Sequence, residues 1–592
     1  MHEIIHLSHS TQANHLTTHF YNAQNSYFAY NDSDIGTRSF VEPSVLFRQG
    51  LGTDHKTQTF TPRAIIWDMR GGFGAMKKSN PIYNYEKVEM NYGVADEFDL
   101  WSAESKKLTL DTINKDSTIK QEKIPLSEYQ QALDLGRANH SMLNTENTKY
   151  WSDYLNIYYN PRLSFHTLPN WEYNPDTAPL GQVRGETGPE ARKFLSYDTG
   201  VNEFKEVNSM GLDGTYIEDT LRPFIEEADN LSGLSLVSEV DTAWGGFSAK
   251  VIEEFRQDYA PKTPLFAWGL YDECLTAELY SFNKGNKYRG GDRKTRIQAL
   301  SRIQSTIALA KSASLVIPLS IPSKIPEEEL KLFDVKSMWH RAAMFMLPFE
   351  TISTLSSLRT GCGRVSMQNI LGDIQGGSNR NIVSSISSSL VQEKEENISN
   401  SDDVQKSLDS RLSIYEKFGS MGIIGKNNKK NINYTTMDMT GSLFRGLDDS
   451  SSSSVRYFTK VGSIRDVECV QLEKSDTTFD TLFKASELQQ LGTSEFSLHQ
   501  YKCSQPFATS SSVPSFPSNE LNMNSPETKN VYTEMGMTSL TRVYMKNCLT
   551  TLEKITRSTD EGIDELKEDI ATITEAYEWG WTDSDDDFFD DD

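Results

Sequence analysis

The loop from Asp241 to Ser248 is the part of this sequence whose residues could bind an anion. It lies between an expected strand and an expected amphipathic helix, where unpaired backbone N–H groups and the positive end of the helix dipole meet. Glycines at such a loop let a phosphate approach the backbone. Only Gly245 and Gly246 are present here, beside the bulky Trp244. The loop therefore fits an ordinary strand-to-helix turn better than a phosphate loop.

Asp68 and a pair of histidines are residues that could take part in a metal site. Asp68 ends a short apolar strand, where open α/β sheets place ligand-facing residues, so its carboxylate could orient a metal-bound water or accept a turn hydrogen bond. His15 and His19 are four residues apart and would share one helix face. No cysteine or carboxylate cluster accompanies them, so we predict no metal site. The chain also has no GxSxG, GxxxxGK or CxxC motif, and we predict no catalytic residue.

The elements that must position these residues alternate in type. Short apolar runs predict strands at 3–7, 63–69, 234–240, 265–268 and 314–317. Apolar residues at helical spacing predict helices at 217–231, 251–259, 297–310 and 326–359. Gly233 is expected to end the first of these helices. The order strand, loop, helix, strand makes a βαβ unit and implies an α/β fold with a parallel sheet.

Composition suggests where this fold is interrupted. The polar stretch at 77–200 is interpreted as an insertion or long loops, and the Ser- and Asn-rich stretch at 374–412 as a flexible insertion. The last ten residues, Asp583–Asp592, hold seven aspartates and two phenylalanines. The expected divisions of the chain are 1–275, 276–373, 374–412, 413–582 and 583–592.

Charge and cysteine content exclude several classes of protein. The chain has 592 residues, with 59 Lys and Arg against 83 Asp and Glu, which gives a net charge of −24. This balance argues against binding to nucleic acid or to anionic lipid. Five widely spaced cysteines fit a reducing compartment. No apolar run reaches the length of a membrane helix. The first basic residue is Arg38, so we expect neither a secretory signal nor a mitochondrial presequence.

Several segments, taken in order, resemble the tubulins and, more closely, the Misato family of tubulin-like proteins. The segments similar to tubulin strands and helices are 1–7, 62–68, 219–233 and 253–259. The segments that fit the Misato pattern are 243–248, 266–269 and 338–343, with Glu350 and Thr351. This resemblance implies a tubulin-like fold: a Rossmann-type parallel sheet with nucleotide-domain topology, then a smaller α/β domain and a helical C-terminal part.

The loops that bind nucleotide in tubulins are altered in this chain. The stretch 10–15 keeps an asparagine but has lost its glycines, and 240–246 keeps only the last glycine of the tubulin signature. Arg70 replaces an acid two residues after Asp68, although it could meet a phosphate, which leaves GTP open as a cofactor. No segment clearly matches the acidic GTPase loop of tubulin. The degenerate nucleotide-loop residues are Gln12, Asn14, Asp68, Arg70, Gly71, Gly72, Thr242, Trp244, Gly245, Gly246 and Ser248.

Side chains at these positions would crowd the phosphates, so we expect weak or no GTP hydrolysis. We also expect Trp244 to occupy or border the space where tubulins hold phosphate. By resemblance, the chain is expected to act in partitioning of mitochondria and inheritance of mitochondrial DNA, at the cytosolic face of mitochondria and in the cytoplasm. Its partners would be proteins: tubulin-like, cytoskeletal or chaperonin components, with the acidic tail as a candidate contact. The alternatives are a tubulin-type GTPase that assembles, or a cofactor in tubulin folding or spindle assembly.

Overall fold

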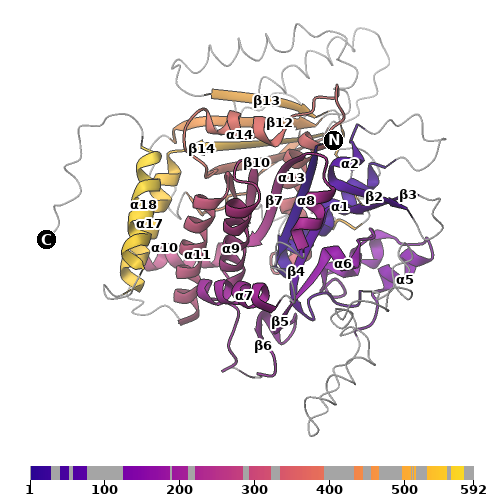
Figure 1. Ribbon diagram of the computed structural model, residues 1–592, viewed down its shortest axis with the longest axis horizontal. Coiled ribbons are helices and arrows are strands. Elements are labelled where there is room, and N and C mark those ends of the chain that lie inside the picture. The colour runs from indigo at the N-terminus through magenta and orange to yellow at the C-terminus, as the bar shows by residue number, and fades with distance from the viewer. Residues whose placement is uncertain are drawn as a thin grey trace, which may run out of the picture.

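Figure 1 shows the protein as a computed structural model. The structure describes residues 2–28, 40–51, 58–76, 124–186, 188, 190–210, 220–283, 293–321, 334–392, 433–444, 455–465, 497–503, 505–507, 510, 512–514, 530–556 and 562–578. The acidic segment 583–592 and the stretch 77–123 lie outside these ranges.

A seven-stranded sheet forms the centre of the molecule, with the order β6-β5-β4-β1-β7-β8-β9. All neighbouring strands are parallel except β5 and β6. The strands are β1 Glu3–His9, β4 Ala64–Arg70, β5 Phe165–Asn174, β6 Ala178–Val183, β7 Leu231–Glu239, β8 Leu265–Leu270 and β9 Leu315–Leu319. The central strands are buried throughout because helices cover both faces, which explains their continuous apolar runs. The predicted α/β class with a parallel sheet is confirmed.

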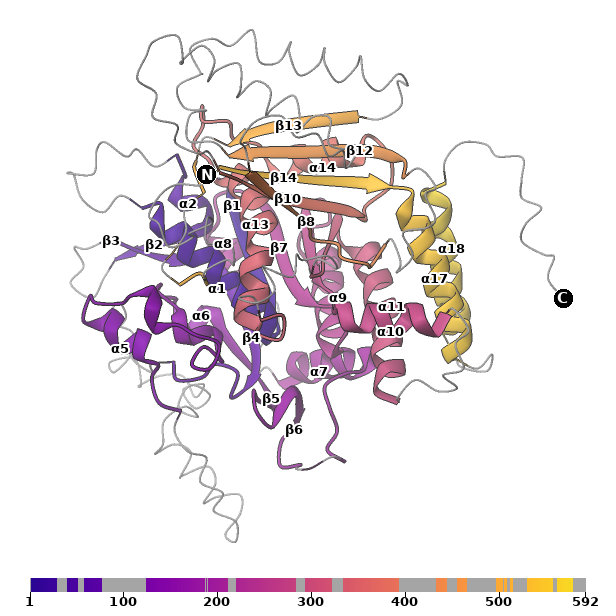
Figure 2. The ribbon, with the colours of Figure 1, turned by 180° about the vertical axis from the view of Figure 1, so that it is seen from behind.

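Helices lie on both sides of this sheet. Helices α1 (Thr11–Ser26) and α13 (Met338–Ser357) pack together on one face. Helices α7 (Tyr197–Met210), α9 (Ala243–Asp258) and α11 (Arg293–Ser312) pack together on the other, as Figures 1 and 2 show from opposite sides. Shorter elements complete this part: α2 Pro43–Leu46, β2 Phe47–Leu51, β3 Gln58–Pro62, α5 Glu128–Asp134, η3 His140–Met142, η4 Trp151–Tyr154, α6 Pro161–Ser164, α8 Arg222–Glu227 and α10 Glu273–Asn283.

A second sheet of five strands, in the order β11-β10-β14-β12-β13, lies at one end of the molecule. Its strands are β10 Ser385–Gln392, β11 Asn433–Asp438, β12 Tyr457–Arg465, β13 Ser497–Cys503 and β14 Asn530–Thr538. Helix α14 (Met367–Gln375) packs against this sheet, and α17 (Leu540–Ile555) and α18 (Ile563–Ala576) form a hairpin beside α10 and α11. A fully buried ion pair joins the two parts, from Glu350 on α13 to Arg465 on β12.

Three segments differ from the expectations. Gly233 does not end a helix, because β7 already begins at Leu231 and α8 stops at Glu227. Within 77–200, residues 165–183 extend the main sheet as β5 and β6 instead of forming long loops. Within 374–412, residues 385–392 form β10, whose serines look loop-like in sequence but face hydroxyl partners, as when Ser388 lies 2.9 Å from Thr533. Residues 393–412 lie outside the described ranges.

The helices that the structure describes also bear on membranes. Among them, none combines the length and apolar character that crossing a bilayer requires.

Candidate functional site

Three of the altered loops meet at one edge of the main sheet. Strands β4, β1 and β7 are neighbours and run parallel, so the segments that follow them emerge side by side. After β1, Ser10 adopts a φ of 121° and caps α1 by accepting a hydrogen bond from the Ala13 backbone N–H. After β7, helix α9 begins at Ala243. The structure therefore brings these residues together at the edge where a doubly wound sheet binds ligands.

Asp68 at this edge is surrounded by donors from the chain itself. Its Oδ1 accepts hydrogen bonds from the Thr11 hydroxyl at 2.9 Å and from the Met69 backbone N–H at 2.8 Å. Its Oδ2 accepts from the Asn14 amide at 2.9 Å and from the Trp151 indole at 3.0 Å. Burial raises the pKa of this carboxyl to about 6, which these hydrogen bonds oppose. Asp68 thus holds α1, β4 and η4 together. Of its two possible roles, orienting a metal-bound water or accepting hydrogen bonds from the chain, these contacts fit the second, structural role.

Trp151 is a residue of this site that the sequence analysis does not predict. It lies within the polar stretch interpreted as an insertion, 83 residues from the aspartate that it contacts. Its indole is fully buried between Phe73 and Phe165. The only sequence signal is a tryptophan amid polar residues, which indicates burial but not a partner.

The first turn of α9 is covered by the chain segment before α7. The Ala243 backbone N–H donates to the Phe194 carbonyl at 3.3 Å. Trp244, with 2% of its surface exposed, has its ring centroid 5.3 Å from that of Phe194 and 5.7 Å from that of Phe247. At the N-terminus of α9, the end that would face a phosphate, one backbone N–H is therefore already bonded and protein side chains fill much of the space.

The two glycines of this turn serve helix packing. A Cβ at Gly246 would lie 2.1 Å from the Tyr197 carbonyl oxygen on α7. A Cβ at Gly245 would lie 2.1 Å from the Ser305 hydroxyl on α11. From the facing side, a Cβ at Gly200 on α7 would lie 1.7 Å from the carbonyl oxygen of the first α9 residue. Helices α7 and α11 can approach α9 this closely only because these side chains are missing.

Other residues of the predicted site also bond within the chain. The Gln12 amide donates to the Met338 carbonyl at 3.2 Å. Ser248 lies 2.8 Å from the His9 ring and donates to Ser238 at 2.8 Å. Thr242 donates to Glu239 at 3.3 Å instead of capping α9. Gln12 thus links α1 to α13, while Ser248 and Thr242 link the start of α9 to the ends of β1 and β7.

The turn after β4 is shaped by Asp68 and by backbone geometry. Gly71 has a φ of +88°, and a Cβ there would lie 2.6 Å from the Tyr173 carbonyl oxygen. A Cβ at Gly72 would meet the Asp68 carboxylate. Arg70 is partly exposed, and its burial lowers the pKa of the guanidinium, an effect that nearby Glu172 opposes. Of the predicted residues, Arg70 therefore keeps a cationic group near the surface.

Three carboxyl groups lie at this edge. Besides Asp68, the structure places Glu239 and Asp241 at and just beyond the end of β7. Burial raises the pKa of the Glu239 carboxyl to about 7, although nearby Arg341 opposes the shift. A polyanion at this edge would meet these carboxyl groups. In the sequence Glu239 lies two residues before the loop and Asp241 begins it, but the sequence does not show which way their side chains point.

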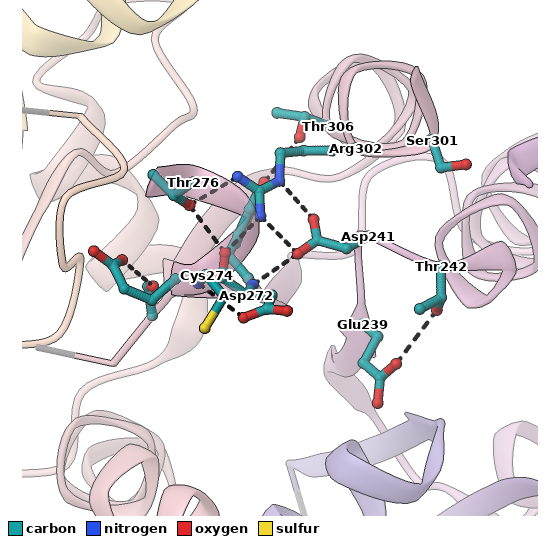
Figure 3. A network of polar contacts seen from close by, with 12 residues as sticks. Glu239, Asp241, Thr242, Asp272, Cys274, Thr276, Ser301, Arg302 and Thr306 are labelled. Atoms are coloured by element: carbon teal, nitrogen blue, oxygen red, sulfur yellow. Dashed lines mark hydrogen bonds and ion pairs between the residues drawn. The ribbon is translucent and has the colours of Figure 1, made fainter. Parts of the chain in front are cut away.

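Asp241 is neutralised within the chain. The Arg302 guanidinium on α11 donates from Nε to Oδ1 and from Nη2 to Oδ2, each at 2.7 Å, as Figure 3 shows. Burial alone would lower the pKa of Arg302, but the Asp241 carboxylate outweighs it and raises that pKa. The loop after β7 is thereby tied to α11.

Neither histidine motif forms a metal centre. The rings of His15 and His19 bond to the Tyr154 hydroxyl at 2.8 Å and to the Trp339 carbonyl at 3.2 Å. The run from His2 to His6 also has the HExxH spacing of zinc sites, but residues 3–6 of it lie on strand β1, and in extended chain four residues span about 13 Å. Among the described residues, no three His, Cys, Asp or Glu side chains are grouped to hold a metal.

GTP is the cofactor that the tubulin resemblance implies, and the described residues do not fit it. The α9 N-terminus donates to the Phe194 carbonyl, and its glycines face other helices. The Asp68 oxygens accept four hydrogen bonds from the chain. The Arg302 guanidinium, a cation that a phosphate could use, is already bound to Asp241.

Comparison with known proteins agrees with the fold. The family described as Misato Segment II tubulin-like domain matches residues 2–135, and the family described as Tubulin domain matches residues 140–358. The chain is 34% identical over 392 residues to "Protein DML1" of Yarrowia lipolytica, covering 66% of this chain and 72% of that protein. It is 33% identical over 385 residues to "Protein dml-1" of Neurospora crassa, covering 65% of this chain and 62% of that protein. It is 32% identical over 361 residues to "Protein dml1" of Aspergillus niger, covering 61% and 62%. The match thus spans a little less than two thirds of the Neurospora and Aspergillus proteins. The chain belongs to the Misato family of tubulin-like proteins.

Proposed function

We propose that this chain is a non-catalytic tubulin-like protein that acts through protein partners in the partitioning of mitochondria and the inheritance of mitochondrial DNA. Family membership supports the mitochondrial role. The observation that supports the non-catalytic role is the hydrogen bonding at the edge of the main sheet where β4, β1 and β7 end. There, the Asp68 oxygens and the first α9 N–H are satisfied by groups of the chain itself.

The place of action proposed is the cytosolic face of mitochondria and the cytoplasm. A net charge of −24 makes direct adsorption to an anionic membrane unfavourable, so recruitment would pass through proteins. The tubulin-like body would provide the scaffold. The seven aspartates of 583–592 would provide one contact for a basic partner surface.

The non-catalytic role is tested on the purified full chain. Nucleotide content is measured after denaturation, and a fluorescent GTP analogue is titrated with magnesium present. We expect no co-purified nucleotide, no saturable binding at micromolar concentrations, and no phosphate release above the buffer rate. Micromolar binding together with phosphate release would overturn the proposal and favour a tubulin-type GTPase.

The mitochondrial role is tested in cells depleted of the protein. We expect these cells to lose mitochondrial DNA and to distribute mitochondria unevenly, and the full chain to restore both. A matched variant replaces the seven tail aspartates with asparagine, which keeps length and removes charge. Failure of this variant to restore inheritance would locate a partner contact in the tail. Normal mitochondria in the depleted cells, with defective tubulin folding or spindles, would overturn the proposed role.

A further inference from the structure

The guanidinium of Arg302 is held in a fixed position inside the protein. Only 2% of the residue surface is exposed. Its Nη1 donates to the Thr276 hydroxyl and its Nη2 to the Asp272 carbonyl, each at 2.8 Å. The Thr276 hydroxyl in turn donates to the Asp272 carbonyl at 3.0 Å. These contacts orient the plane of the guanidinium without using an anion, as Figure 3 shows.

The remaining donors converge on one carboxylate. Arg302 Nε and Nη2 each lie 2.7 Å from a different oxygen of Asp241. The Asp272 backbone N–H donates to the second of these oxygens, also at 2.7 Å. A planar fork plus a backbone N–H is the arrangement by which proteins recognise carboxylates and oxyanions. Nothing in these three contacts requires the carboxylate to be attached to the chain.

The anion joins elements that are separate in the sequence. Asp241 follows β7, Asp272 and Thr276 lie at the start of α10, and Arg302 lies in α11. Removing the carboxylate would leave a buried cation facing an empty space of carboxylate size, which is strongly unfavourable. A small anion from solution could relieve that cost.

We propose that Arg302 and the Asp272 backbone N–H form an anion receptor, with the Asp241 side chain as its tethered occupant, and that the receptor binds a small free carboxylate when this side chain is shortened. Because the anion is attached to the chain, the link between β7, α10 and α11 is always present. With a free anion, the link would depend on the concentration of that anion. This inference is independent of the proposed mitochondrial role, and the two can fail separately.

The test uses the full chain with Asp241→Ala, followed by thermal unfolding in sodium formate and in sodium chloride at equal ionic strength. We expect Tm to fall by roughly 4 °C in chloride, from the loss of a buried partner. We expect formate at about 0.1 M to restore about half of this loss, because binding to the folded state stabilises it. Asp241→Gly removes one carbon more, so acetate should then restore Tm better than formate.

The control variant is Asp241→Ala with Arg302→Met. Without the guanidinium, formate and chloride should give the same Tm, and calorimetric titration with formate should show no binding. Equal restoration in this double variant, or no advantage of formate or acetate over chloride in the single variants, would overturn the proposal.

A second pair of variants covers the case in which Asp241→Ala does not fold. Asp241→Asn keeps the side-chain volume and removes the charge. We expect it to be less stable than the double variant Asp241→Asn with Arg302→Met, because the latter leaves no unpaired buried cation. The opposite order of stability would show that the carboxylate is not the counter-anion of Arg302, and would overturn the proposal.

Discussion

Asp68→Asn is the substitution that separates a structural role for this residue from a role with bound nucleotide. The carboxylate accepts two hydrogen bonds at each oxygen. An amide has a single oxygen, which can keep the donors on one side. Its NH2 group would then point at the donors on the other side, the Asn14 amide and the Trp151 indole.

The expected cost follows from these contacts. A buried donor left without an acceptor costs about 1–3 kcal/mol. The Asn14 amide keeps the Trp67 carbonyl as an acceptor at 3.1 Å, so the free energy lost at Asn14 is at the lower end of this range. Among the described residues, the Trp151 indole donates to Asp68 alone, so it bears the larger loss. We expect the free energy of unfolding to fall by about 3 kcal/mol at pH 7.5.

The same substitution has a pH signature. Burial raises the pKa of Asp68 from 3.8 to about 6, so the folded state binds a proton more readily than the unfolded chain. This group therefore adds stability as the pH falls through 6, and that gain is absent above pH 7. Between pH 7.5 and pH 5 the gain is about 1 kcal/mol. The asparagine variant lacks it, so the difference between the two proteins should widen to about 4 kcal/mol.

The assay is urea unfolding of both proteins at pH 7.5 and pH 5, with GTP-analogue binding measured in parallel. We expect a stability difference that grows at the lower pH and no change in nucleotide binding. If the variant were as stable as the original chain but bound nucleotide differently, Asp68 would act on a ligand and the structural reasoning would be refuted.

Two further predictions concern packing and acid stability. Gly200→Ala should lower the free energy of unfolding by about 2 kcal/mol, because its Cβ would press on the α9 backbone. Gly372→Ala on α14, where the space is open, is the control and should raise the free energy of unfolding by about 0.5–1 kcal/mol. Equal effects of the two substitutions in urea unfolding would contradict the packing of α7 on α9. Lowering the pH from 7.5 to 5 should destabilise the whole chain, because burial lowers the pKa of six histidines and the unfolded chain then binds the protons. These are His6, His9, His15, His19, His166 and His340. The four histidines with pKa values of about 3 to 4, which are His6, His9, His19 and His166, each lose about 2 kcal/mol. The carboxyls whose pKa is raised to about 6 or 7 recover roughly 5 kcal/mol, which leaves a net loss of a few kcal/mol. The carboxyls whose pKa is raised that far are Asp68, Asp153 and Glu239. A urea midpoint that is unchanged or higher at pH 5 would contradict this.

Much of the main sheet could be predicted from local patterns. A short apolar run bounded by turn residues carries its own signal, as in β4, which the sequence predicts at 63–69 and which spans Ala64–Arg70. Strands whose signal is weak were missed. Strand β5 mixes aromatic and polar residues and depends on β4 for its partner, and β10 reads as a serine-rich loop until β14 lies beside it.

The candidate site shows the same division. The loss of glycines around residues 10–15 and 240–246 is visible in the sequence and is enough to predict an altered nucleotide edge. The sequence also shows Asp68 at the end of its strand. It does not show that the glycines at 245 and 246 face other helices, since that depends on where α7 and α11 pack.

The sequence by itself determined the α/β class, the family and the loss of phosphate-loop glycines, because each is written in contiguous residues. Only the tertiary structure decided what occupies the edge of the sheet. Trp151 reaches Asp68 across 83 residues, and Arg302 reaches Asp241 across 61. Such partners are chosen by the packing of whole helices and strands, and a buried polar group must find one of them or lose stability. No local pattern specifies which partner that is.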